Sequence, residues 1–455
     1  MAAPLTTKGQ KTIPTPWQES ILKRDFEVTL GKMLQPEQGN EMETEEPYLR
    51  SANVQWDGVD VSDIKMMWFA PREKKELLLR SGDLVVNEGG DVGRCATWSG
   101  ELEACYFQNA VNRVRPRQQA SARFLYYWLY NIKHAGFIDA IVSRTTIAHL
   151  TAEKLEAIPW ADAPPTEQHL IAAYLDASCA AIDSAVAAKR RQLETLDALR
   201  SSIISRTVTQ GLNPSAKTRP SGVSWLGEIP QHWQDGHLKR YARRIQTGVT
   251  PPTDTPEYYE DGTIPWFAPG SFDGQIELTE PRKLINERAL SEGVLRMFPA
   301  GSVFAIGIGA TIGKVGVIAE EASCNQQIIG IVCDHRMTPR FLAYQLKIYE
   351  VVIPGICVAT TLPIFNQVQV GYLPVIVPPV SEQQAICDYI DTKLGELKKV
   401  VGVLESQIDT LASYRKSLIH ECVTGQRRIT EADVRAIQER AAKLTRESAL
   451  PSPPA

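Results

Sequence analysis

Apolar residues recur at alternating spacings of four and three residues over two long stretches of this chain. In the second stretch Arg415 holds the one polar place among Ile390, Leu394, Leu397, Val401, Leu404, Ile408, Leu411 and Leu418. The first stretch shows the pattern more weakly, through Leu175, Cys179, Ile182, Val186, Lys189, Leu193, Leu196, Arg200 and Ile203. This heptad pattern is typical of helices that pack along one another. We call the residues of each pattern the seam of that helix. Each stretch therefore predicts a helix of about 40 residues, or roughly 60 Å.

The starts of these helices and their mutual orientation are also predicted. Each stretch follows a proline pair, and Thr166 and Ser381 are the expected N-cap residues. Two seams in one chain meet at high effective concentration. A parallel pair would bury Arg200 against Arg415, which is costly, whereas an antiparallel pair moves each arginine toward Asp391 or Asp176. We expect antiparallel packing within the chain; pairing between two copies of the chain is the alternative.

Shorter patterns before each helix predict a mixed α/β domain. Apolar runs bounded by Gly, Asp and Asn predict strands at 83–87, 105–114 and 154–160 in the first domain, and at 302–306 and 327–333 in the second. Helices are expected at 123–132 and 339–349. A short helix near 431–444 and a proline-rich tail, 450–455, end the chain.

The whole arrangement occurs twice. Residues 145–210 align with 360–425 at a constant offset of 215, so that Thr145-Thr146 falls on Thr360-Thr361 and Glu167-Gln168 on Glu382-Gln383. The preceding parts match less closely. A period this long indicates two copies of a domain rather than a solenoid. Two similar domains related by antiparallel helices suit a ligand with two similar sites, such as duplex DNA with its local two-fold symmetry.

Composition sets limits on this interpretation. At 455 residues and 43% hydrophobic content the chain is expected to form two to four globular domains. Apolar runs stay below about 18 residues, so no membrane span is expected. The eight cysteines form no C-x-x-C pair and are expected as buried thiols, without a metal site. A net charge of −4 means that any nucleic-acid contact must come from local clusters of basic residues.

Motifs for catalysis or nucleotide binding do not fit. None of the four Pro-Pro pairs belongs to the N-P-P-Y/F loop of an adenine methyltransferase. The segment Gly307–Lys314 is one residue too long for G-x-G-x-x-G, and a P-loop would need glycine where Ile308 stands. We interpret it as a glycine turn between strands, matched by Gly89–Arg94 in the first copy. Two functions remain as alternatives to a non-catalytic DNA-binding protein. One is an enzyme with unrecognised motifs, and the other is a scaffold that no longer binds DNA.

At this point the chain resembles a known family, the specificity (S) subunit of Type I restriction-modification systems. The resemblance covers roughly residues 12–428. It rests on the linker from Ser221 to Trp233, on Gly248-Val249-Thr250-Pro251, on Thr361 to Pro374, and on the helix start Pro379-x-x-Glu382-Gln383. The chain departs from the family in its extra C-terminal helix and tail, and in the start of its first recognition domain, 26–32.

The resemblance implies an α+β fold: two mixed α/β target-recognition domains separated by two long conserved helices that form an antiparallel coiled coil, with a pseudo-two-fold internal repeat. The expected segments are target-recognition domain 1 (1–160), a central helical region (161–212), target-recognition domain 2 (213–376), a distal helical region (377–428) and the extra helix and tail (429–455). It implies a non-catalytic DNA-recognition subunit that reads a bipartite, asymmetric site in bacterial or archaeal cytoplasm. The implied partners are double-stranded DNA, two methyltransferase (M) subunits and, through the complex, restriction (R) subunits. No cofactor is expected on this chain, and S-adenosylmethionine, ATP and Mg are expected on the partner subunits.

Candidate DNA-binding residues lie in turns with glycine, hydroxyl or basic side chains, because such residues can approach phosphates and bases. They are Arg50, Asn53, Gly90, Arg94, Thr145, Thr146, His149, Thr250, Gly309, Thr311, Lys314, Thr360 and Thr361. Asn109 and Gln326, at matched positions, could contact adenine or be buried strand polars. Arg113, Arg115 and Arg117 alternate along one strand, where a solvated edge is the simplest expectation. The expected subunit-interface residues are Leu175, Ile182, Leu193, Leu196, Leu394, Leu397, Val401, Leu404, Ile408 and Leu411.

Overall fold

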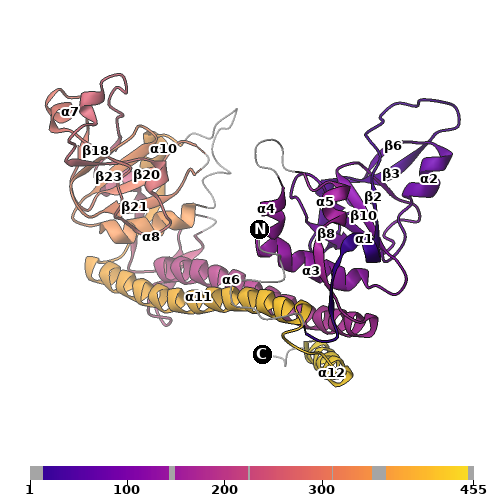
Figure 1. Cartoon of the computed structure of the whole chain (residues 1–455). Helices are drawn as coiled ribbons and strands as arrows, with labels where there is room; N and C mark the ends of the chain where they lie inside the picture. Colours follow the sequence, from indigo (N-terminus) through magenta and orange to yellow (C-terminus); the bar gives the residue numbers. More distant parts are fainter. Residues whose placement is uncertain (1–13, 143–148, 224–225, 310, 351–364, 449–455) are drawn as a thin grey trace. The chain divides into compact units, whose positions relative to one another are not determined.

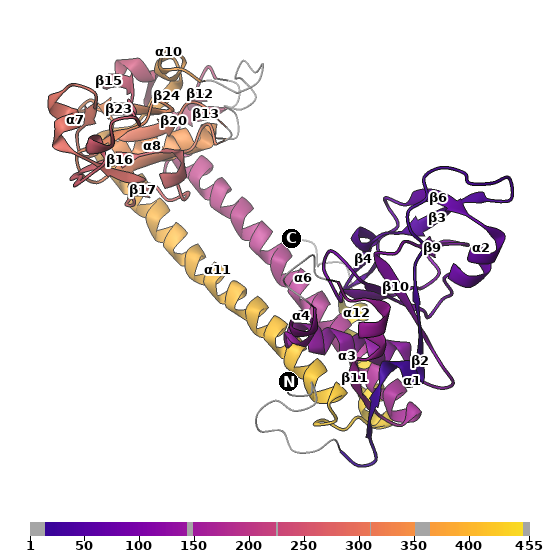
Figure 2. The same cartoon turned by 45° about the horizontal axis from the view of Figure 1, so that its top comes forward.

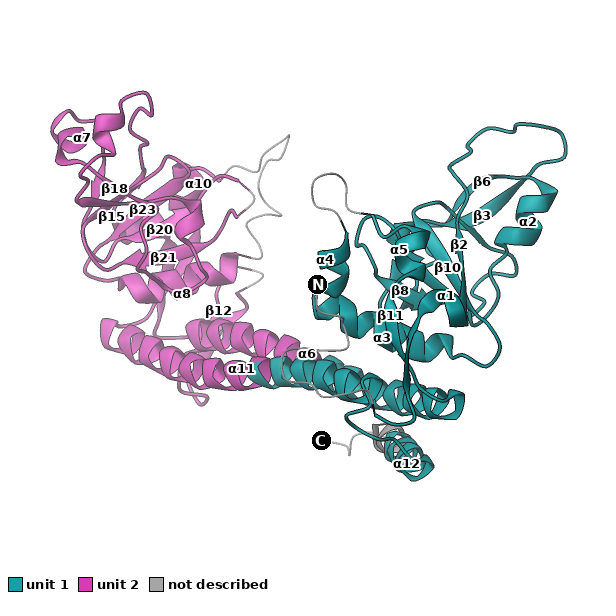
Figure 3. Cartoon of the chain, in the orientation of Figure 1, with its two compact units in different colours: residues 1–189, 406–455 teal, residues 190–405 magenta. Residues whose placement is uncertain are grey.

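The structure, a computed structural model, describes residues 14–142, 149–223, 226–309, 311–350 and 365–448. These residues form two compact units, which are described separately (Figure 3). Unit 1 comprises 1–189 and 406–455, and unit 2 comprises 190–405. Each unit contains one head, namely 14–162 or 218–377, together with parts of the two long helices.

The two long helices are α6 (Pro165–Gln210) and α11 (Val380–Val423). In unit 1 the first part of α6 lies beside the last part of α11, and Leu175 shares a buried cluster with Leu418 (Figure 1). In unit 2 the end of α6 lies beside the start of α11, where Val208 shares a cluster with Ile390 (Figure 2). In both units the helices therefore run antiparallel within one chain, as predicted.

Two details of the helices differ from the prediction. Both begin two residues before the start that these N-caps imply, at Pro165 and Val380, so Thr166 and Ser381 lie inside the first turn. Proline is well suited to the first helical position, because its missing N–H would have no partner there. Arg415 lies 3.5 Å from Asp183 and over the ring of Tyr130. It does not pair with Asp176, because an arginine from the head, as described below, already occupies that carboxylate.

The first head is built around a four-stranded sheet in the order β2-β10-β7-β8, beside a three-stranded sheet in the order β6-β3-β9. Helix α3 packs on strand β8 of the larger sheet. The strands are β1 (Gln18–Ile21), β2 (Phe26–Leu30), β3 (Thr44–Leu49), β4 (Val54–Gln55), β5 (Gly58–Val59), β6 (Lys65–Phe69), β7 (Leu84–Asn87), β8 (Cys95–Thr97), β9 (Tyr106–Phe107), β10 (Val111–Pro116) and β11 (Pro159–Asp162). The helices are α1 (Leu22–Asp25), η1 (Ser51–Asn53), α2 (Pro71–Leu77), α3 (Ala122–His134), α4 (Phe137–Ile141) and α5 (Ala152–Glu156).

The second head has a five-stranded sheet, β15-β23-β20-β21-β17, and a four-stranded sheet, β18-β16-β22-β19. The strands are β12 (Thr218–Pro220), β13 (Glu228–Pro230), β14 (Gln234–His237), β15 (Ala242–Thr247), β16 (Ile264–Phe267), β17 (Glu277–Leu278), β18 (Lys283–Ile285), β19 (Met297–Phe298), β20 (Val303–Ile306), β21 (Val315–Ile318), β22 (Ala322–Cys324), β23 (Ile328–Cys333) and β24 (Pro374–Val377). The helices are η2 (Leu238–Arg240), η3 (Pro256–Tyr258), η4 (Pro269–Ser271), α7 (Glu287–Ser291), α8 (Pro339–Tyr349) and α10 (Gln367–Gly371). The predicted helices at 123–132 and 339–349 and the strands at 83–87, 302–306 and 327–333 are confirmed.

Two predicted strands and the C-terminal helix need correction. Residues 154–160 begin as helix α5, because Thr151 accepts a hydrogen bond from the N–H of Lys154 and caps a helical turn, and β11 starts only at Pro159. The run 105–114 is interrupted between β9 and β10 by a turn closed from Val111 N–H to Gln108 O at 2.9 Å. At the C-terminus α12 spans Glu431–Ser448, four residues beyond the predicted end at 444.

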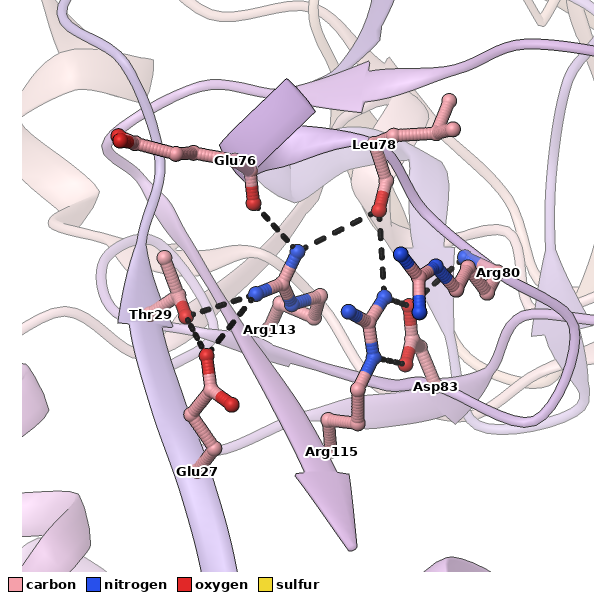
Figure 4. A network of polar contacts seen from close by, with 8 residues as sticks. All are labelled: Glu27, Thr29, Glu76, Leu78, Arg80, Asp83, Arg113 and Arg115. Atoms are coloured by element: carbon pink, nitrogen blue, oxygen red, sulfur yellow. Dashed lines mark hydrogen bonds and ion pairs between the residues drawn. The ribbon is translucent and has the colours of Figure 1, made fainter. Parts of the chain in front are cut away.

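The solvated edge expected for the alternating arginines of β10 is also wrong for Arg113. Its side chain is only 3% exposed and donates hydrogen bonds to Glu76 O at 2.8 Å and to the Thr29 hydroxyl at 2.9 Å (Figure 4). Arg115 pairs with Asp83 at 2.6 Å beside it. The pKa of Arg113 is lowered by burial and by neighbouring Arg115. This network ties β2 and β10 to the end of α2 and to the segment after it, so it belongs to the core of the first head.

The apolar content of α6 has a structural use. Among the described residues it is the one helix long and apolar enough to cross a membrane by length and composition, with a window of mean hydropathy 1.4. Ile171, Leu175 and Ile182 of this helix lie in the core cluster of unit 1. Part of the apolar surface of α6 is thus buried against the first head and α11, and 39% of the apolar window is buried.

Candidate nucleic-acid interface and docking surface

Three candidate segments of the first head, far apart in sequence, meet at one place. The amide of Asn87 donates to Ser51 O at 3.0 Å, which ties the end of β7 to the turn at Arg50–Asn53. Gly90 faces Ser51, and its φ of +74° suits glycine. His149 lies against Gly89. The structure therefore brings Ser51, the neighbour of Arg50, together with the Gly89–Gly90 turn and His149, although Arg50 and His149 are 99 positions apart in the sequence.

Within this group Arg50 and Asn53 have different roles. Arg50 donates to the Asp63 carboxylate at 2.7 Å, and its side chain is 27% exposed. Asn53 is 3% exposed. Its side-chain amide oxygen accepts a hydrogen bond from Arg50 N–H at 2.9 Å, and its side-chain NH2 donates to Asp60 O at 2.9 Å. Asn53 thus holds the turn that presents Arg50, and a direct contact from Asn53 to a base stays a prediction.

Arg94 and His149 each lie near a carboxylate without a close ion pair. Arg94 is 3.6 Å from Asp91, which is also 3.8 Å from Lys133. His149 Nδ1 is 3.8 Å from Glu88, whose pKa is raised chiefly by burial while His149 acts to lower it. Arg94 is therefore held less closely by its carboxylate than Arg50, which lies 2.7 Å from Asp63.

The matching end of the second head gathers Thr250, Gln326 and Gly309. The Thr250 hydroxyl donates to the Gln326 amide oxygen. Gly309 lies against the side chain of Gln327, with a φ of +109°. The segment Gly307–Lys314 connects the antiparallel strands β20 and β21, which confirms its interpretation as a glycine turn. Thr311 and Lys314 lie in this hairpin, where Lys314 N–H donates to Thr311 O at 3.3 Å.

The two heads share a set of backbone hydrogen bonds around these turns. Four bonds of the first head have counterparts of nearly the same length in the second, which indicates the correspondence of residues. The pairs are Gly31 N to Val111 O with Gly248 N to Ile328 O, Lys32 N to Phe107 O with Val249 N to Cys324 O, Gln108 N to Leu49 O with Asn325 N to Phe267 O, and Glu88 N to Ala110 O with Gly307 N to Gln327 O. The first head thus starts like the second in structure, although residues 26–32 differ in sequence. Thr145, Thr146, Thr360 and Thr361 lie outside the described residues.

Each head is joined to its own long helix by one buried glutamine. In unit 1 the side-chain amide oxygen of Gln168 accepts a hydrogen bond from Ser121 N–H at 2.8 Å. The side-chain NH2 of Gln168 donates at 2.7 Å to Ala163 O, just before α6. In unit 2 the side-chain amide oxygen of Gln383 accepts a hydrogen bond from Thr338 N–H at 2.7 Å. The side-chain NH2 of Gln383 donates at 2.8 Å to Pro378 O, just before α11. Both glutamines are at most 1% exposed.

An arginine and a tyrosine complete the same joint. In unit 1 Arg123 and the Tyr127 hydroxyl donate to the Asp176 carboxylate at 2.6 and 2.7 Å. In unit 2 the same contacts are made by Arg340, Tyr344 and Asp391. The sequence repeat did not reveal this set of three residues, although Arg123 and Arg340 occupy matching positions in the two copies.

The seam residues are mostly occupied by packing within the chain. In unit 1 Leu175 and Ile182 are buried with α11 and the head, and Leu411 packs against the same cluster; Ile408 is half-buried. In unit 2 half-buried seam residues line the facing helices, namely Leu193, Leu196, Leu394, Leu397, Val401 and Leu404. The more exposed apolar residues of unit 2 lie off the seam: Leu199 (45%), Tyr389 (42%), Val400 (47%) and Val403 (57%). An apolar residue off the seam of an otherwise polar helix is the signal that could have identified them.

Other chemistry has little support in the described residues. Within the described ranges no group of three or more His, Cys, Asp or Glu side chains could hold a metal ion. Seven cysteines with free thiols are described, and six of them are buried. Burial raises the pKa of the Cys387 thiol to about 11 and of the Cys422 thiol to about 12, so these thiols are not activated as nucleophiles.

Comparisons with known proteins agree with this geometry. The Type I restriction modification DNA specificity domain matches twice, over residues 14–195 and 231–400. The specificity subunit of the Type I restriction enzyme MjaIX from Methanocaldococcus jannaschii is 27% identical over 187 residues, 40% of this chain and 43% of that protein. The EcoBI specificity subunit from Escherichia coli is 26% identical over 250 residues, 53% of this chain and 51% of that protein. The matched segments therefore span about half the length of these curated relatives.

Two solved structures share the fold. A chain from a study of complex assembly and conformational transition of the type I R-M system has a TM-score of 0.72 at 14% identity, covering 91% of this chain and 99% of its own. The HsdS subunit from Thermoanaerobacter tengcongensis has a TM-score of 0.54 at 16% identity, covering 92% and 100%. With two matches of the domain along most of its length, this chain belongs to the family of Type I restriction-modification DNA specificity subunits.

Proposed function

We propose that this chain is the DNA sequence-recognition subunit of a Type I restriction-modification complex, and that each head reads one half of a bipartite, asymmetric site. The observation that carries the proposal is the repeated frame of backbone hydrogen bonds, which presents different side chains at matched turns. Arg50, Arg94 and His149 lie at these turns in the first head, and Thr250, Thr311 and Lys314 in the second. Base contacts specify sequence whereas phosphate contacts only position the protein, so two different sets of side chains would read two different half-sites.

In this proposal the long helices hold distance and orientation and dock the partner subunits. Two M subunits, and through the complex R subunits, would bind the chain, which has no catalytic role of its own. S-adenosylmethionine, ATP and Mg²⁺ would be held by those partners in the cytoplasm. The exposed apolar residues Leu199, Val400 and Val403 of unit 2 support docking on the helices, since an apolar surface that the chain itself leaves uncovered is suited to a protein partner.

Exchange of the first head tests the modular proposal. Residues 12–160 are replaced by the matching segment of a relative, while both helices and residues 213–376 remain. Methylated adenines in host DNA are then mapped by single-molecule sequencing. We expect one half-site to change while the other half-site and the gap stay fixed. A change in both half-sites, or in the gap alone, would contradict the proposal.

Two double variants on α11 test docking. Val400→Asp with Val403→Asp changes only exposed positions, so the fold should persist while M-subunit binding falls at least tenfold. Leu397→Asp with Leu404→Asp places carboxylates in the seam, where burial costs several kcal/mol, and should abolish both assembly and DNA binding. Complex formation is measured by co-purification and analytical ultracentrifugation. Unchanged M binding by the first variant would remove these valines from the docking surface.

A further inference from the structure

Unit 2 contains a pocket of about 370 Å³ at the joint between the second head and its helices. Four cationic side chains line it, from α6, α8 and α11: Arg200, Arg340, Lys347 and Lys398. Carboxylates line it as well, so the question is which of these charges already have partners.

Arg340 and Asp391 neutralise one another as an ion pair, and the Tyr344 hydroxyl also donates to Asp391. Asp273 accepts a hydrogen bond from Gln275 N at 2.9 Å within its own turn. The third carboxylate, Glu277, belongs to an exposed residue. Of the carboxylates that line the pocket, that of Asp391 therefore already has a cationic partner in Arg340.

Arg200 and Lys347 are left without a carboxylate. Both donate to the same acceptor, Gly274 O, at 3.2 Å and 2.6 Å. Among the described residues neither has an acidic oxygen within the 4.0 Å of an ion pair. A carbonyl carries only a partial charge, so two neighbouring full positive charges converge on a group that cannot neutralise either of them.

The surroundings of Lys347 show how unfavourable this arrangement is without an anion. Burial lowers the pKa of Lys347, and Arg200 and Lys314 lower it further, while Glu350 and Asp273 act in the opposite direction. A bound anion would offset the repulsion between the two cations and would act against the lowering of the pKa of Lys347.

The same place in the first head is filled by aromatic rings. Ala343 and Lys347 correspond to Tyr126 and Tyr130, because Arg340-Phe341-Leu342 matches Arg123-Phe124-Leu125. Trp56 packs edge-on against Tyr126 and Tyr130, with ring centroids 6.1 and 5.0 Å apart. The second copy has thus exchanged the ring of Tyr130 for the ammonium group of Lys347, which lines the pocket, and the ring of Tyr126 for the buried methyl group of Ala343.

We propose that the pocket binds a small anion of the phosphate class, held between Arg200 and Lys347. A guanidinium presents paired N–H donors that suit an oxyanion, and the ammonium adds a point charge on its other side. The volume fits inorganic phosphate or the phosphate groups of a small molecule such as a nucleotide, and it is too small for a DNA duplex. Occupancy would strengthen the seating of the second head on α6, because one ligand would contact both α6 and α8.

The test uses the full-length chain without DNA or partner subunits, so its outcome is independent of the proposed function. Inorganic phosphate, pyrophosphate and adenosine triphosphate are titrated in separate arms by isothermal calorimetry, with chloride at matched ionic strength as the reference. We expect saturable binding at one site, and the arm with the tightest binding identifies the source of the phosphate group.

Matched variants locate the site. Lys347→Met with Arg200→Met should weaken binding at least tenfold, and so should Ala343→Tyr with Lys347→Tyr, which restores the aromatic filling of the first copy. Lys399→Met, an exposed lysine on α11 outside the pocket, should bind as the parent does. Circular dichroism melts confirm that each variant is folded. Binding that does not saturate, or equal binding by the parent and both pocket variants, would overturn the proposal.

Discussion

The central strands of the two heads, β10 and β23, occupy the same place in the shared frame but are packed in different ways. Arg113 of β10 pairs with Thr29 in the sheet, and Gly330 of β23 pairs with Gln246. Gly330 follows Arg113, and Gln246 follows Thr29, by the same 217 positions. Gly330 therefore occupies the position at which the first head has a buried arginine. In the second head the ring of Phe298 fills the space over Gly330, and Arg244 lies 4.7 Å from that ring.

The difference shows which parts of the fold are held in common. Matched backbone hydrogen bonds and the glutamine joint recur in both heads, because they position the turns and attach the head to its helix. The side chains that fill the space between the sheets do not recur. One head uses a buried cation bonded to carbonyls, and the other uses an aromatic ring over a glycine. The frame therefore tolerates either filling, provided that the space is full.

The largest effect is expected from removing the glycine. In Gly330→Ala the added Cβ would lie 2.2 Å from a carbon of the Phe298 ring, which is fully buried and cannot move away. We expect the free energy of unfolding of the second head to fall by about 3 kcal/mol. Hydrogen exchange monitored by mass spectrometry would report this on peptides of β20 and β23, while peptides of the first head keep their protection.

A helical glycine provides the control for this variant. Gly402 of α11 has no atom within 4 Å of an added Cβ, so Gly402→Ala should stabilise the protein by about 0.5–1 kcal/mol. Equal behaviour of the two variants would show that the ring over Gly330 can yield, and the contrast between the heads would lose its physical basis.

An intermediate effect is expected in the first head. Arg113→Met keeps much of the apolar volume but removes the donors to Glu76 O, Leu78 O and the Thr29 hydroxyl. We expect the free energy of unfolding to fall by about 2 kcal/mol, because the buried acceptors lose their hydrogen-bond partners. Removal of the buried charge offsets part of this loss. Chemical denaturation of the full chain measures the change. Arg117→Met, at an exposed position of the same alternating series, should change nothing, and an equal loss there would refute the network.

The sequence predicted the arrangement of the long helices because heptad spacing is a local pattern that survives in every turn. It also predicted the hairpin at Gly307–Lys314, since glycine and strand residues alternate over a short range. It could not predict the burial of Arg113, because that depends on carbonyls 35 and 37 positions away. Residues 154–160 misled for a related reason: Leu155 and Ile158 suit a strand, but the Thr151 cap selects a helix first.

The candidate site shows the same limit. Turn residues such as Gly90 and Gly309 were found from glycine spacing alone. The meeting of Ser51, the Gly89–Gly90 turn and His149 was not, because it depends on the tie from Asn87 to Ser51. The exposed Val400 and Val403 were not predicted, because the heptad pattern identifies only the residues that pack inside the chain.

The smallest effect is expected at the joints, and it tests whether the two copies differ there. Arg123 and Arg340 have side-chain exposures of 38% and 42%, and their aspartates 44% and 35%, so solvent screens both ion pairs. Removing either arginine should therefore cost at most about 1 kcal/mol. Arg123 also lies over the rings of Tyr126 and Tyr127, at 4.3 and 5.1 Å, whereas the second copy has Ala343 at the first of these positions. Arg123→Met should thus cost slightly more than Arg340→Met, by a few tenths of a kcal/mol. Denaturation of the two single variants and the double variant in one buffer resolves such a difference, and a larger loss for Arg340→Met would show that the ion pair, not the aromatic contact, dominates the joint.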